Sequence, residues 1–108
     1  MRAEAKLRKS GDAASALADV NAVRAARTAT TPPPALSSMT LDLLFRERGF
    51  ELYWEALRRT DMIRFGKYED TWTEKSNADK MKRLFPIPQT AIDGASNLPG
   101  YLRQNDSY

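Results

Sequence analysis

The spacing of apolar side chains predicts two helices in the first 26 residues. Leu17, Val20 and Val23 recur at helical spacing, and small alanines flank the stripe that they form. The stretch before them consists largely of Ala and long straight-chain residues, which favour a helix. Between the two segments, Gly11 suits the left-handed position that follows a helix end. We therefore expect an antiparallel helical hairpin over residues 2–26.

The pattern then breaks and resumes in a longer apolar stretch. Three consecutive prolines in residues 28–39 cannot continue a helix and predict an extended linker. Thr40 suits the N-cap of the next helix, whose apolar positions cover more than one face. We expect a central helix over residues 40–66 that is buried on several sides, with Trp54 in the core. Residues 58–65 either continue this helix or form a short second one.

Neither helical nor alternating spacing dominates residues 67–108. Residues 67–83 are polar and predict a long loop. Pro86 and Pro88 favour an extended segment, because a proline pushes the preceding residue away from the helical region. A short helix can begin after Pro88 and end near Asp93, ahead of a turn-rich tail. The expected fold class is all-α, with helix pairs, long irregular loops and an extended C-terminal tail.

Composition excludes several kinds of site. The chain has 108 residues, which fits one domain, and it contains neither His nor Cys. It therefore lacks Ser-His-Asp triads, thiol nucleophiles and thiolate zinc sites. The net charge of +3 comes from the first 39 residues, and acidic residues interrupt the basic ones, so we expect no nucleic-acid partner. No segment approaches the ~20 apolar residues of a membrane span. We expect no metal and no cofactor.

Charged residues alternate with aromatic and aliphatic ones between positions 47 and 64. In a continuous helix, glutamates four residues apart share one face, and arginines three or four residues away can pair with them. We expect a structural ion-pair network, because buried charges need partners. Catalytic carboxylates are the alternative, but nearby arginines lower the pKa of a carboxyl group and a general acid needs a raised one. The predicted network comprises Glu47, Arg48, Glu51, Glu55, Arg58, Asp61 and Arg64.

This stretch resembles the SusD/RagB family of bacterial nutrient-uptake outer-membrane lipoproteins. The family pattern E-R-x-x-E-L-x-x-E-G-x-R-x-x-D-L-x-R-x-G matches residues 47–66, except that Ala56 replaces a common Gly and Met62 replaces Leu. Residues 84–93 look like L-x-P-I-P-x-x-x-I-[ND], and residues 16–24 resemble A-L-x-x-[IVL]-N-x-V-R. The three motifs follow the family's order and are spread over the chain from residue 16 to residue 93.

The resemblance implies a tetratricopeptide-like helical protein that binds and does not catalyse. Members sit on the external face of the outer membrane of Bacteroidetes-type bacteria, cap a TonB-dependent (SusC-like) transporter and help to capture glycans or other nutrients. They are several-fold longer and carry a lipid anchor on a Cys, which this chain lacks. We therefore expect residues 1–108 to be the C-terminal portion of such a protein, soluble by itself. A freestanding intracellular helical interaction module of tetratricopeptide type is the alternative.

No family motif for ligand contact maps onto this chain, because the ligand contacts of characterised members lie mostly upstream. The local candidates come from chemistry alone. Sugar recognition uses aromatic faces together with amides that bond hydroxyl groups, and loops often carry function. The predicted ligand-binding residues are Trp72, Tyr68 and Asn77, which share the polar loop.

Overall fold

The computed structural model describes residues 1–27, 31–76, 78–95 and 100–108, and within these ranges it contains helices and no strand. This confirms the all-α class. The chain divides into two compact units, residues 1–61 and 62–108. In the described ranges, no helix is long and apolar enough to cross a membrane. The elements are α1 (Arg2–Ser10), α2 (Ala13–Ala25), α3 (Leu41–Glu51), α4 (Arg58–Arg64), the 3₁₀ helix η1 (Lys80–Arg83) and α5 (Gln89–Gly94).

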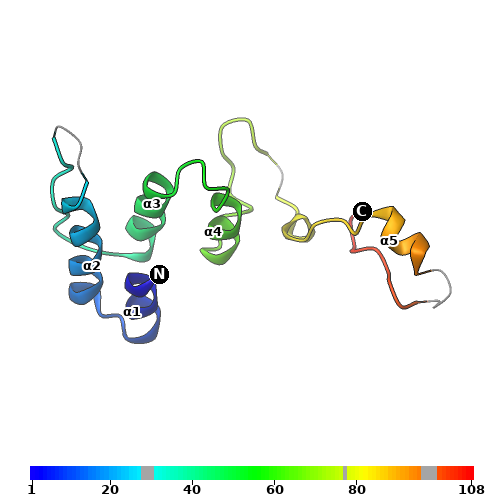
Figure 1. Ribbon diagram of the computed structural model, residues 1–108, viewed down its shortest axis with the longest axis horizontal. Helices are drawn as coiled ribbons and strands as arrows, with labels where there is room; N and C mark the ends of the chain where they lie inside the picture. Colours follow the sequence, from blue (N-terminus) through cyan, green and yellow to red (C-terminus); the bar gives the residue numbers. More distant parts are fainter. Residues whose placement is uncertain (28–30, 77, 96–99) are drawn as a thin grey trace. The chain divides into compact units, whose positions relative to one another are not determined.

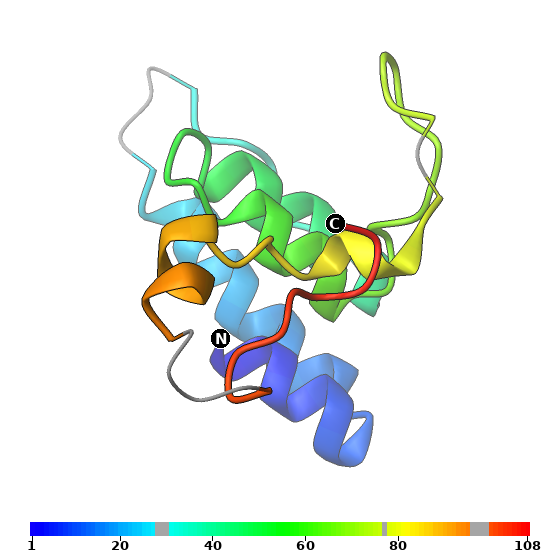
Figure 2. The same ribbon diagram turned by 90° about the vertical axis from the view of Figure 1, so that its right-hand side faces the viewer.

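The N-terminal hairpin forms as its local signals predict. Gly11 ends α1 with a left-handed φ of 66°, and the Asp12 carboxylate caps α2 by accepting from the Ser15 amide at 3.0 Å. Figures 1 and 2 show α1 and α2 side by side. Ala16 and Val20 are buried, so small side chains let the helices approach closely. Val23, expected on the apolar stripe, is instead exposed.

The proline-rich linker is fastened to α2 by two polar side chains. The Asn21 carboxamide donates to the Leu36 carbonyl at 3.0 Å and accepts from the Leu36 amide at 2.8 Å. The Arg24 guanidinium donates to the Pro34 carbonyl through Nε and Nη2, at 2.9 and 2.8 Å. A segment without its own backbone ladder thus obtains partners from a neighbouring helix.

The prediction of one central helix over residues 40–66 is wrong in the length of the helix. Thr40 caps α3 as predicted, with its hydroxyl accepting from the Leu43 amide at 3.2 Å, but the helix ends at Glu51. Residues 52–57 turn, and Trp54 and Ala56 adopt left-handed φ values of 67° and 56° that a right-handed helix excludes. The chain then forms α4 as the short second helix.

The aromatic residues of this region do not form the core. The expectation that the central helix is buried on several sides, with Trp54 in the core, is therefore wrong. Phe50, Tyr53 and Trp54 are 70%, 73% and 88% exposed. The buried apolar side chains of the described residues are few and small in total volume: Ala3, Ala16, Val20, Met39, Leu44 and Phe45.

In the second unit, the tail returns along the proline-flanked segment. The Gln104 carboxamide accepts from the Ile87 amide at 2.8 Å and donates to the Ile87 carbonyl at 2.9 Å. Asn105 Nδ2 donates to the Phe85 carbonyl at 2.6 Å. Side-chain amides therefore supply the hydrogen bonds that the backbone of this extended segment would otherwise make with a neighbouring strand. The described part of the predicted loop, residues 67–76 and 78–83, contains no helix before η1 at its end.

Candidate functional site

The charged residues of the central motif, residues 47–66, connect segments that lie far apart in the sequence. Glu47 accepts from Arg24 Nη1 at 2.5 Å, and Glu51 forms an ion pair with Arg27. Arg24 lies in the last turn of α2 and Arg27 follows that helix, and neither belongs to the predicted network. Since α3 ends before Glu55, the three glutamates do not share one helix face, and Glu55 lies exposed in the turn. Arg24 therefore joins α2, the linker and α3.

Arg48 and Asp61 form a buried ion pair, in which the side chains are 12% and 3% exposed. Arg48 Nε donates to Asp61 Oδ2 at 2.8 Å, and Nη2 donates to Oδ1 at 3.0 Å. Asp61 is only 2% exposed. A buried carboxylate is tolerated when a guanidinium meets both of its oxygens. This pair brings the start of α4 back against α3.

Arg58 packs onto α3 beside this pair. Its Nη1 donates to the Phe45 carbonyl at 2.9 Å, and its guanidinium carbon lies 3.7 Å from the centre of the Phe45 ring. A Cβ on Gly49 would come within 2.8 Å of Arg58 Nη1, so the glycine makes room for the arginine. Burial lowers the pKa of Arg58, and the charge of Asp61 acts in the opposite direction. Arg64 is exposed on α4, with its guanidinium 5.5 Å from the Phe65 ring.

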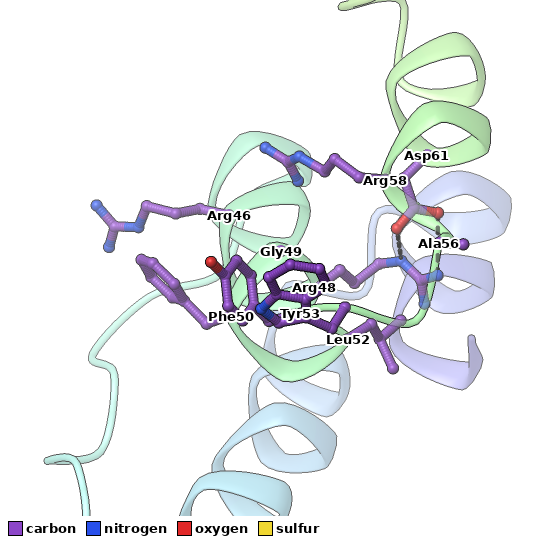
Figure 3. A pocket seen from close by; sticks show the side chains of 10 residues that line it. Arg46, Arg48, Gly49, Phe50, Leu52, Tyr53, Ala56, Arg58 and Asp61 are labelled. Atoms are coloured by element: carbon purple, nitrogen blue, oxygen red, sulfur yellow. Dashed lines mark hydrogen bonds and ion pairs between the residues drawn. The ribbon is translucent and has the colours of Figure 1, made fainter.

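A pocket of about 660 Å³ opens beside the turn at residues 52–57 (Figure 3). Its lining includes Phe50, Tyr53 and Trp54, and the rings of the last two meet edge to face with centroids 5.7 Å apart. Arg46 and Phe50 extend to one side of α3 in Figure 3, away from the Arg48–Asp61 pair. We call this site the aromatic–arginine pocket.

The chemistry of the aromatic–arginine pocket suits binding. Exposed aromatic faces can pack against the C–H faces of a sugar, and a guanidinium offers a fork of donors to oxygen acceptors. The carboxyl group in its lining, Asp61, is held by Arg48 at both oxygens and is not placed for proton transfer to a ligand. Within the described ranges, no three acidic side chains gather into a metal site.

The loop candidates from the sequence are engaged by their own loop. Trp72 is 40% exposed, and its Nε1–H donates to the Lys67 carbonyl at 3.5 Å. The Tyr68 hydroxyl donates to the Lys82 carbonyl at 3.0 Å. Asn77 lies outside the described residues. Trp72 and Tyr68 thus share the loop as expected, but their polar atoms bond backbone, and their role in ligand binding stays a prediction.

The sequence reasoning missed the aromatic–arginine pocket because it placed these aromatic residues in the core. One signal was available. Phe50, Tyr53 and Trp54 follow the i, i+3, i+4 spacing of a single helix face. In a continuous helix that face lies opposite the one that carries Leu41 and Phe45, so one buried stripe cannot hold both sets. Some of them therefore had to be exposed or to face a second partner.

The model of the SusD family matches residues 1–108, which is the full length of the chain. No curated protein matches it.

Proposed function

Because the chain belongs to the SusD family, we propose that it binds an oligosaccharide nutrient in the aromatic–arginine pocket and leaves the sugar chemically unchanged. The family is one of non-catalytic nutrient-binding proteins of the outer membrane. The observation that carries the proposal is the exposure of Phe50, Tyr53 and Trp54 around one pocket. Large exposed apolar patches rimmed by polar groups mark binding sites.

In this proposal the protein acts at the external face of the outer membrane, beside a TonB-dependent transporter. The three motifs, in the order found here, support the assignment of residues 1–108 to the C-terminal region of a family member. The genomic neighbourhood tests both statements. We expect a coding sequence continuous with this one upstream and a gene for a TonB-dependent transporter nearby. An isolated gene without either would favour an intracellular interaction module instead.

Affinity electrophoresis of the 108-residue chain in gels containing different polysaccharides tests the binding. We expect at least one polysaccharide to retard the protein, and Trp54→Ala to weaken that binding about tenfold or more, because it removes the most exposed ring of the pocket. The matched control is Trp72→Ala, which removes the other tryptophan and should leave the retardation unchanged. Retardation that depends on Trp72 and not on Trp54 would move the site to the loop.

The absence of turnover is checked on the same samples. Incubating the retarding polysaccharide with the chain should release no new reducing ends, because no carboxyl group in the pocket lining is placed as a general acid. Release of reducing ends that is lost in a Glu55→Gln variant would contradict the proposal and assign hydrolysis to the exposed glutamate of the turn.

A further inference from the structure

The lining of the aromatic–arginine pocket contains more positive than negative side chains. Its charged side chains are Arg46, Arg48, Arg58 and Asp61. Asp61 is compensated by Arg48 through two hydrogen bonds, so the two remaining arginines leave the lining cationic. A pocket lining with a net positive charge beside apolar walls attracts negatively charged ligands.

Arg46 is the guanidinium that a ligand can engage directly. It is exposed on α3 and makes no hydrogen bond or ion pair with any residue that the structure describes. By contrast, Arg48 is bound to Asp61, and Arg58 is bound to the Phe45 carbonyl. In Figure 3 Arg46 extends on the same side of α3 as Phe50, away from the Arg48–Asp61 pair.

We propose that the aromatic–arginine pocket selects oligosaccharides that contain uronic acids, and this inference rests on the proposed function. The rings of Phe50, Tyr53 and Trp54 pack against the sugar faces, and Arg46 meets the carboxylate of one uronic acid residue. The guanidinium fork matches a carboxylate with two parallel hydrogen bonds, which a neutral hydroxyl group cannot reproduce.

Isothermal titration of the 108-residue chain against two hexasaccharides tests the inference. One is the hexamer of galacturonic acid, and the other is its fully methyl-esterified form, which has the same backbone without charge. We expect the acid to bind about tenfold more tightly than the ester, and this advantage to shrink as salt is added. Equal affinities would overturn the selectivity but leave the proposed function intact, whereas binding of neither would contradict both.

Arg46→Gln locates the charge recognition. It should remove the advantage of the acid over the ester, and Arg46→Lys should restore only part of it, because an ammonium keeps the charge but loses the fork. The matched control is Lys9→Gln, which removes one exposed charge from the last turn of α1, outside the pocket lining. If Lys9→Gln lowers the preference as much as Arg46→Gln does, net charge and not Arg46 is responsible, and the inference fails.

A final arm separates a sugar from an acidic polypeptide. Poly-glutamate of matched length carries carboxylates but offers no sugar face to the rings. We expect it to bind at least tenfold more weakly than the galacturonate hexamer, with no effect of Trp54→Ala. Poly-glutamate that binds as tightly as the hexamer would show that the pocket binds protein and would overturn the inference. Loss of sugar binding because the chain associates with itself would have the same meaning.

Discussion

The charge pair of Arg48 and Asp61 sets the local geometry at the scale of single residues. Residues 13 positions apart would lie about 20 Å apart in one continuous helix, yet these two side chains exchange hydrogen bonds of 2.8 and 3.0 Å. The pair therefore requires the turn between α3 and α4. It also explains why a carboxylate tolerates burial at this position, since both of its oxygens are bonded.

Asp61→Asn should destabilise the chain by about 3 kcal/mol, because it leaves the Arg48 guanidinium largely buried beside a neutral amide. Urea unfolding followed by circular dichroism measures this loss. The control is Asp106→Asn, which removes a carboxylate that is exposed and lies 3.8 Å from Arg103, and which should cost less than about 0.5 kcal/mol. Equal small losses in both variants would mean that the Arg48–Asp61 pair is not buried.

The break between α3 and α4 is the decisive feature at the scale of elements. Ala56 holds a φ of 56° at the position where the family pattern commonly has glycine. Glycine adopts this conformation without steric cost, whereas alanine is strained there. The departure from the family pattern is thus a local weakness of this chain.

Ala56→Gly should stabilise the chain by about 0.5–1 kcal/mol, because the relief of left-handed strain exceeds the entropy that glycine adds to the unfolded state. The comparison variant is Ala18→Gly, at an exposed position inside α2, which should destabilise by about 1 kcal/mol. Thermal melts of both variants give opposite signs if the chain turns at Ala56. Destabilisation by both would indicate that residues 52–57 continue the helix.

The sequence predicted the elements whose signals are local. The hairpin of α1 and α2 needs only Gly11, Asp12 and alanine-rich faces, all of which are read directly from neighbouring residues. The end of α3 could not be read in this way, because the segment has helical spacing throughout and its break depends on pairing between Arg48 and Asp61. The aromatic–arginine pocket follows from that break, so it was missed for the same reason.

At the scale of the whole molecule, polar side chains join separate segments within each of the two units. Arg24 and Glu47 join the linker to α3, and Gln104 joins the tail to the proline-flanked segment. Arg24 and Glu47 belong to the motifs at residues 16–24 and 47–66, and Gln104 follows the motif at residues 84–93. In the proposed function, the exposed rings beside the turn are the groups that meet a ligand.

The two tryptophans of the chain provide the most direct test, because each marks one candidate site. An ¹⁵N-labelled chain gives one indole N–H signal for Trp54, in the aromatic–arginine pocket, and one for Trp72, in the loop. Titration with the galacturonic acid hexamer should shift the Trp54 signal in a saturable manner and leave the Trp72 signal in place, with assignments taken from the two alanine variants. A saturable shift of Trp72 with an unmoved Trp54 would contradict the account.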